Sequence, residues 1–225
     1  MAAVMLWIAA QPAARGAEVS FCPIPGSRLN ASVESLAEQR WKHVIRQGLD
    51  ISCGSAALAT IINYQFGDQV SEDAIIRTIL ANVKAEEVRK RGGFSLLDLK
   101  KVGAALGYTV KGYKLSLQDL MILDTPALVP ITVRGFKHFV VFRGSTEERV
   151  ALADPSFGNI VISTDDFLHA WQGIALVLSR QGTEQRQSDL EIAPHDLPWQ
   201  NQPEAFHNFI NRDVVRTGLR DADEF

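Results

Sequence analysis

The chain has 225 residues, of which 46% are hydrophobic and 22% charged, so it carries enough apolar material for one packed core. Its formal net charge of −3 gives no support to nucleic acid or an anionic membrane as a partner, because both select basic surfaces. Two cysteines and five scattered histidines are too few for a structural zinc site or a disulfide framework, and no cofactor is expected.

The N-terminus resembles the later part of a secretory signal. Residues 2–10, AAVMLWIAA, form an apolar run too short to span a bilayer, and small residues at positions 14 and 16 follow it as before a cleavage site. We therefore expect residues 1–17 to be a signal or N-terminal apolar segment, and the protein to be periplasmic or secreted with no membrane span after processing. Because the positive region that begins most signals is missing, a buried helix in a cytoplasmic protein is the alternative.

Helical patterns dominate the next part of the chain. Three helices are predicted, over Cys53–Phe66, Ser71–Asn82 and Ser95–Gly107. The helix that begins at Cys53 is apolar nearly all round, which indicates a central, buried helix with Ser52 as its N-cap. Two stretches lack this pattern: Trp41–Ile45 predicts a short strand, and the charged stretch Lys84–Gly93 predicts a surface loop.

The second half of the chain is rich in β-forming residues. Strands are predicted at Tyr108–Tyr113, Ala127–Val133, His138–Arg143, Arg149–Ala153, Ile160–Ser163 and Ile174–Ser179, with short helices over Ser116–Leu123 and Thr164–Trp171. Helices followed by an antiparallel sheet predict an α+β domain over residues 18–180, with the N-terminal helices packed on the sheet. Residues 181–225 are polar and rich in proline, and we expect a C-terminal tail or docking segment outside the core, with a short amphipathic helix over Glu204–Val215.

The stretch QGLDISCGSAAL, residues 47–58, has the features of a nucleophile site. Cys53 stands where the central helix begins, and the unpaired N–H groups and positive dipole end of a helix N-terminus stabilise a thiolate. Gln47 lies six positions upstream, and its amide together with the backbone N–H of Cys53 would supply two donors for an oxyanion. Most cysteines at such positions are ordinary buried residues, so a catalytic role requires a histidine brought close by the fold.

His138 and Asp154 are the candidates that complete the site. His138 opens a strand directly after the turn RGFK, and Asp154 ends the next strand in ADPSFG, so adjacent antiparallel strands would bring the two side chains together. Each residue also has an interpretation without catalysis: His138 could be an ordinary histidine at a strand edge, and Asp154 could simply begin an Asp-Pro turn. His43, ten residues before Cys53, is an alternative base, although a short strand would place it at the surface.

Four segments together resemble the bacteriocin-processing, double-glycine cysteine peptidases, a papain-like family. They are QGLDISCGSAALATIINY, GFSLLDLKKVGAALGY, KHFVVFRG and VALADPSFGNIVIS, and the resemblance spans about Ile45 to Leu178. The resemblance implies a papain-like fold with Cys53 as nucleophile, His138 as base, Asp154 orienting the imidazole and Gln47 in the oxyanion hole. Many members are N-terminal domains of peptide-exporting ABC transporters. This chain lacks a membrane bundle and a P-loop, and it is more similar to stand-alone secreted members, including the periplasmic peptidase of functional-amyloid secretion operons.

The resemblance therefore implies a cysteine endopeptidase that cleaves a peptide or protein in the bacterial envelope, with small pairs such as Gly-Gly as candidate cleavage sites. Its partner would be an exported or amyloid-system protein. A peptidase-like module that binds a secretion client without cutting it is one alternative. A papain-like acyl transferase is another, because the same residues serve acyl transfer to an amine.

Overall fold

The computed structural model describes the backbone of residues 17–21, 29–123, 125–180 and 188–192, and the side chains of these residues from 34 onward. The chain divides into two compact units, residues 1–40 and 41–225. In the first unit, β1 (Ala17–Phe21) pairs antiparallel with β2 (Leu29–Val33). The apolar run at residues 2–10 and the helix expected at Glu204–Val215 lie outside the described residues.

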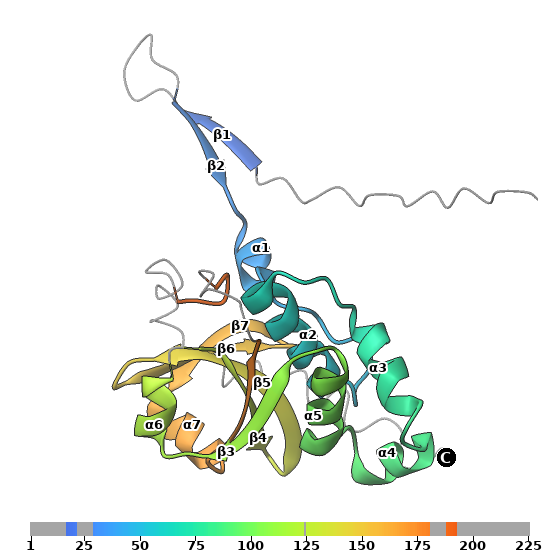
Figure 1. Ribbon diagram of the computed structural model, residues 1–225. Helices are drawn as coiled ribbons and strands as arrows, with labels where there is room; N and C mark the ends of the chain where they lie inside the picture. Colours follow the sequence, from blue (N-terminus) through green and yellow to red (C-terminus); the bar gives the residue numbers. More distant parts are fainter. Residues whose placement is uncertain (1–16, 22–28, 124, 181–187, 193–225) are drawn as a thin grey trace, which may run out of the picture. The chain divides into compact units, whose positions relative to one another are not determined.

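The second unit is built on a six-stranded sheet in which all neighbouring strands are antiparallel. The strand order is β3-β8-β4-β5-β6-β7 (Figure 1). Their bounds are β3 (Thr109–Lys114), β4 (Ala127–Val133), β5 (Phe136–Ser145), β6 (Arg149–Asp154), β7 (Gly158–Ser163) and β8 (Ile174–Ser179). The strands β4 to β7 follow one another as hairpins, as the spacing of the turn residues predicts.

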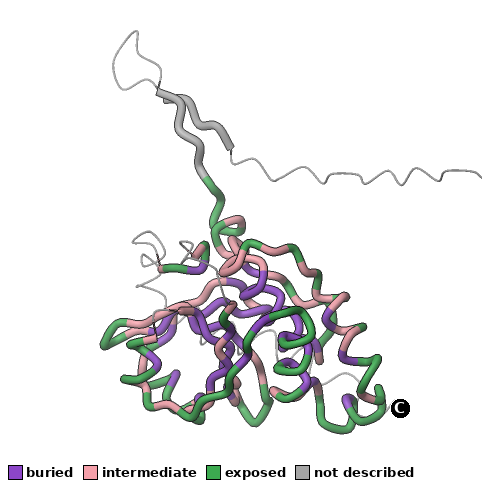
Figure 2. The backbone as a smooth tube through the Cα atoms, viewed as in Figure 1, coloured by how far each residue is buried: buried purple, intermediate pink, exposed green. Residues whose placement is uncertain are grey.

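Helices cover both faces of this sheet. One side carries α2 (Cys53–Phe66), α3 (Glu72–Leu80), α4 (Ala85–Arg91) and α5 (Leu96–Ala105). The other side carries α6 (Leu117–Ile122) and α7 (Thr164–Ala170). The helix α1 (Leu36–Trp41) includes residues 40 and 41, between which the sequence divides into the two units. The helix α2 contacts β4 and β5 and is buried over its first ten residues, 53–62, so it lies at the centre of the main core (Figure 2). The predicted α+β architecture is confirmed.

Two predicted elements are wrong. Trp41–Ile45 is not a strand, because Trp41 ends α1 and two of the backbone groups that a strand would offer to a neighbour are bonded to side chains. Thr60 Oγ1 accepts the N–H of Ile45 at 3.0 Å, and Asn159 Nδ2 donates to the carbonyl of Lys42 at 2.8 Å.

The charged stretch Lys84–Gly93 contains α4 rather than a loop. Acidic residues lie in the first turn of α4 and basic residues in its last turn, which suits the helix dipole, and Gly92 ends it in the left-handed conformation with φ 74°. Val88 is 2% exposed and packs in the main core, so one buried side chain attaches this charged helix to the rest of the domain.

Part of the segment predicted as a tail packs against this core. Leu190 is 0% exposed and belongs to the same apolar cluster as α2. Arg143 on β5 donates to the backbone carbonyls of Leu190 (Nε, 2.8 Å) and Glu191 (Nη2, 3.1 Å). Gly144 leaves room for this segment, because a Cβ there would lie 2.6 Å from Ile192 Cδ1 and the isoleucine would have to move. Residues 188–192 are therefore a docked segment.

Candidate active site

Cys53 is the first residue of α2 and is 7% exposed, with a free thiol. The residue after it explains why the helix sits so close to the sheet. A Cβ at Gly54 would lie 2.9 Å from Leu99 Cδ1 on α5 and 3.0 Å from Phe139 Cδ2 on β5, so only glycine permits this approach. Phe139 directly follows His138, and the tight contact thus brings Cys53 toward the strand that carries the histidine.

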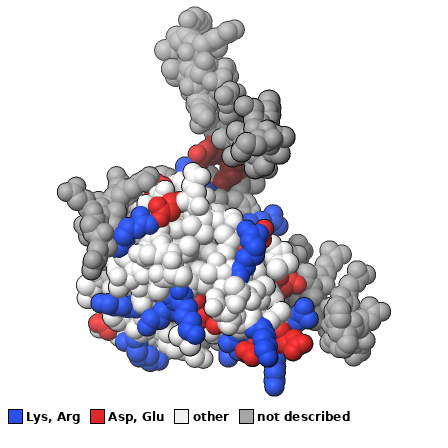
Figure 3. All heavy atoms as spheres, turned by 45° about the vertical axis from the view of Figure 1, so that its right-hand side comes forward, with Lys and Arg blue, Asp and Glu red and all other residues white. Residues whose placement is uncertain are grey.

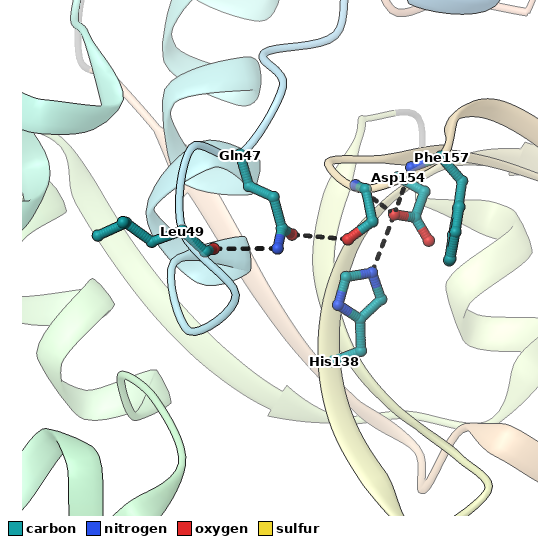
Figure 4. Close-up of polar contacts among 6 residues, drawn as sticks. Gln47, Leu49, His138, Asp154 and Phe157 are labelled. Carbon is teal, nitrogen blue, oxygen red and sulfur yellow. Dashed lines mark hydrogen bonds and ion pairs between the residues drawn. The ribbon is translucent and has the colours of Figure 1, made fainter. Parts of the chain in front are cut away.

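His138 and Asp154 form the expected pair. His138 Nε2 lies 2.9 Å from Asp154 Oδ1, at the junction of β5 and the end of β6 (Figure 4). Asp154 is 2% exposed, and the same oxygen accepts the backbone N–H groups of Ser156 at 2.7 Å and Phe157 at 3.2 Å. The turn that follows β6 therefore fixes the carboxylate, and the carboxylate fixes the imidazole ring.

His138 also forms a hydrogen bond with Cys53, and both of its partners favour the protonated ring. Burial lowers the pKa of His138, but the charge of Asp154, the hydrogen bond to Asp154, and the hydrogen bond and charge of Cys53 together outweigh burial and raise that pKa to about 10. Because Nε2 faces Asp154, Nδ1 is the ring nitrogen available to the sulfur. The ring bridges thiol and carboxylate, and its raised pKa favours an imidazolium, which can donate from both nitrogens.

Gln47 lies beside the same turn. Its Oε1 accepts the hydroxyl of Ser156 at 2.7 Å, its Nε2 donates to the carbonyl of Leu49 at 3.0 Å, and its backbone N–H donates to the carbonyl of Pro155 at 3.0 Å. Figure 4 shows the Gln47 amide between Leu49 and the turn that holds Asp154, with its oxygen toward that turn. The acceptance of the Ser156 hydroxyl fixes the orientation of the amide, so its NH2 group is the end that faces Leu49.

The structure thus places His138 between Cys53 and Asp154 and links Gln47 to Asp154 through Ser156. His43 is elsewhere: its ring lies 5.1 Å from that of Tyr64, about three helical turns beyond Cys53 on α2, so it cannot act on the thiol.

Two polar residues near the site were missed from the sequence. Ser156 lies inside the ADPSFG motif, where a serine after Asp-Pro is common enough to pass as turn chemistry. Glu72 accepts hydrogen bonds from Gly48 and Ser52, and no local pattern signals a contact across twenty or more residues of chain. Ser52 itself does not cap α2 with its side chain as predicted, because its hydroxyl is bonded to Leu49 and Glu72 instead.

In the part of the chain that the structure describes, no three His, Cys, Asp or Glu side chains are grouped to hold a metal ion. Among those same residues, no helix combines the length and the apolar character needed to cross a bilayer. On the face shown in Figure 3, basic and acidic side chains lie around a broad area without charge.

The chain is similar to known proteases over most of its length. Residues 41–183 match the peptidase C39 family. The probable functional amyloid protease FapD of Pseudomonas aeruginosa is 33% identical over 212 residues, which is 94% of this chain and 93% of that protein. FapD of Pseudomonas fluorescens is 32% identical over 222 residues, covering 98% of this chain and 97% of that protein.

A solved structure shows the same fold. It is a double-glycine-motif protease from an AMS/PCAT transporter in complex with the leader peptide, 25% identical, with a TM-score of 0.52 over 63% of this chain and 96% of that one. The match confirms the predicted papain-like α+β fold.

Proposed function

The chain belongs to the peptidase C39 family and is a cysteine peptidase, and from this premise we propose that Cys53 is its nucleophile and that it cuts within polypeptides of the bacterial envelope. The single observation that carries the proposal is the position of His138, which contacts the sulfur of Cys53 on one side and Asp154 on the other. A thiol, an imidazole and a carboxylate in this order form the arrangement that nucleophilic catalysis uses.

In the proposed mechanism, Cys53 and His138 rest as a thiolate and an imidazolium. The sulfur attacks the scissile carbonyl carbon, and the carbonyl electron pair moves to the oxygen, which Gln47 Nε2 and the Cys53 N–H stabilise. His138 then gives its proton to the leaving amine as the C–N bond breaks. Water attacks the resulting thioester, His138 takes a proton from it, and the acid product leaves with the thiolate restored.

Asp154 acts in this scheme by orientation and charge. Its Oδ1 accepts from Nε2 of His138, which keeps Nδ1 directed at the sulfur, and its charge favours the protonated ring. Two backbone N–H groups hold the carboxylate oxygen, so it stays in place when the ring loses its proton.

The substrate is proposed from the relatives. Two Pseudomonas proteins that match nearly the whole chain are described as probable functional amyloid proteases, which supports an exported component of an amyloid secretion system as the substrate. The structural relative is a double-glycine-motif protease, which supports cleavage after small pairs such as Gly-Gly. The apolar run at residues 2–10 supports a periplasmic or secreted location.

The test compares new protein N-termini in extracts of a Gram-negative envelope after incubation with the protein, its Cys53→Ala variant or its Cys22→Ala variant. We expect termini that appear with the wild type and with Cys22→Ala but not with Cys53→Ala, and the residues before each cut should be small. New termini with Cys53→Ala would overturn the assignment of the nucleophile.

An absence of new termini with all three proteins would contradict endopeptidase action on these extracts. Added masses on amine acceptors would then identify acyl transfer. Full biological activity of Cys53→Ala in cells would identify a client-binding module.

A further inference from the structure

The six residues from the proposed oxyanion donor to the start of the helix, Gln47–Ser52, form a short loop that ends at the nucleophile. This oxyanion loop is held by a carboxylate from another helix. Glu72, the first residue of α3, accepts the N–H of Gly48 with both oxygens, at 3.2 Å for Oε1 and 3.0 Å for Oε2. Its Oε1 also accepts the hydroxyl of Ser52. One side chain therefore contacts the loop beside Gln47 and again beside Cys53.

The contacts continue inside the loop to the amide of Gln47. Ser52 is 0% exposed, and its Oγ accepts the N–H of Leu49 at 3.1 Å and lies 2.8 Å from the Leu49 carbonyl. That carbonyl accepts Nε2 of Gln47 at 3.0 Å. A chain of hydrogen bonds thus runs from the Glu72 carboxylate through Ser52 and Leu49 to the group proposed to bind the oxyanion.

The fit between Glu72 and the loop is close. A Cβ at Gly48 would lie 3.2 Å from Glu72 Oε2, so the carboxylate rests against the backbone at a position where a side chain would displace it. Hydrogen bonds to an ionised carboxylate are roughly twice as strong as those between neutral groups. A loop of six residues held at two points by such bonds has little freedom to move its amide groups.

We propose that Glu72 is a positioning residue for the oxyanion hole, which fixes the oxyanion loop so that Gln47 Nε2 is held ready for the oxygen of the tetrahedral intermediate. The inference rests on the proposed function, because it assigns a role in the same reaction. Glu72 touches no reacting atom and acts only through the loop.

An alternative role for Glu72 is to stabilise α3, since an acidic residue in the first turn favours any helix. The chain offers a matched control for this alternative. Asp73 is the next residue of the same first turn, and it is exposed. Asp73→Ala removes the same charge from the same helix end without removing a contact to the oxyanion loop.

The first experiment separates acyl transfer from the reactivity of the thiol. Cleavage of a fluorogenic peptide with a Gly-Gly site needs the oxyanion hole, whereas alkylation of Cys53 by iodoacetamide does not form an oxyanion. We expect Glu72→Ala to lower kcat by up to about 10²-fold with little change in KM, because a small misplacement of a catalytic group costs that much. Alkylation should change less than about twofold, and Asp73→Ala should leave both rates unchanged.

A second variant tests whether Glu72 acts through Gln47. Residues that act through one another give non-additive losses, so Gln47→Ala/Glu72→Ala should be no slower than Gln47→Ala alone. Glu72→Gln keeps one acceptor oxygen for Gly48 and should recover part of the rate. Independent losses that multiply in the double variant, or an equal loss of alkylation in Glu72→Ala, would overturn the proposal.

Hydrogen exchange of the Gly48 amide, measured in the full chain, makes the inference testable without a substrate. Glu72→Ala should speed this exchange and Asp73→Ala should not. If the wild type cuts no Gly-Gly peptide, the proposed cleavage site is wrong while the exchange result still decides the role of Glu72. Unchanged Gly48 exchange in both Glu72→Ala and Glu72→Gln would overturn it.

Discussion

At the N-terminal end of α2, the side chains around Cys53 are held by hydrogen bonds between polar groups, whereas near its C-terminal end the segment 188–192 is held to the core by the buried apolar side chain of Leu190 and by backbone groups. The N-terminal end carries the His138–Asp154 and Gln47–Ser156 contacts and the bonds of Glu72 to the oxyanion loop. At the other end, Leu190 is fully buried in the core, and the N–H of Asp189 donates to the carbonyl of Tyr64 at 3.0 Å.

The comparison teaches that reactivity and stability are controlled at different ends of one helix. An intramolecular hydrogen bond contributes about 1 kcal/mol net to folding, but the same bond can place a catalytic group to within a fraction of an ångström. A buried leucine contributes more to folding and nothing to the geometry of reacting atoms. Substitutions at the two ends should therefore change different measured quantities.

Apart from loss of the nucleophile in Cys53→Ala, the largest effect on rate is expected at the polar end, from Gln47→Ala. Removal of one oxyanion donor costs about 10² to 10³ in kcat in well-studied hydrolases, so cleavage should fall by that factor while Cys53 alkylation is unchanged. Ser156→Ala keeps the amide but removes the hydroxyl that fixes it, and one neutral hydrogen bond predicts a loss of no more than about tenfold. A slower alkylation of Cys53 in Gln47→Ala would show that Gln47 also supports the reactivity of the thiol, so the loss of cleavage could not be assigned to the oxyanion hole alone.

The apolar end should show the opposite result. Leu190→Ala is expected to lower the free energy of unfolding by about 2 to 5 kcal/mol, because it leaves a cavity in the main core. The side chain of its neighbour Glu191 is exposed, so Glu191→Ala should stay within about 0.5 kcal/mol and serves as the control. Urea unfolding measures both values. Cleavage per folded molecule should be unchanged in both variants, and a change in Leu190→Ala would show that the two ends are coupled.

These two ends also differ in how far the sequence reveals them. The bounds of α2, β4 and β8 follow from strong apolar patterns, and Cys53, His138 and Asp154 stand in motifs whose spacing is dictated by strand pairing and by the helix start. A carboxylate that bonds the backbone of a distant glycine leaves no such pattern, so Glu72 was invisible.

The burial of Leu190 in the main core was not predicted, for a related reason. Leu190 and Ile192 are isolated apolar residues in a polar stretch, and the groups that receive them, Arg143 and Gly144, look like ordinary strand residues. Periodicity detects elements that bury a repeating face. It does not detect a short segment that is held by one leucine and by backbone carbonyls.

The smallest expected effect is a shift in the pH dependence of kcat/KM, caused by a substitution at the polar end of α2. Asp154→Asn keeps a hydrogen-bond acceptor for His138 but removes the charge that raises the pKa of that residue to about 10. For the wild type, the fall of kcat/KM at high pH should follow loss of the imidazolium proton near pH 10. In Asp154→Asn the same fall of kcat/KM should occur at a lower pH. The kcat/KM values of the two proteins should differ least under acidic conditions, where the imidazole is protonated in both.

The raised pKa also makes a prediction for stability. Because His138 binds its proton more tightly in the folded protein than in the unfolded chain, where the pKa is about 6.5, the contribution is fully present below pH 6.5 and is lost as the pH rises toward 10. The free energy of unfolding of the wild type should therefore fall across this range, and that of Asp154→Asn should fall less. Parallel curves of the free energy of unfolding against pH for the two proteins would contradict the ion pair, and they would show that the polar end does not contribute to stability. Different curves would show that below pH 6.5 the catalytic end also helps to hold the fold.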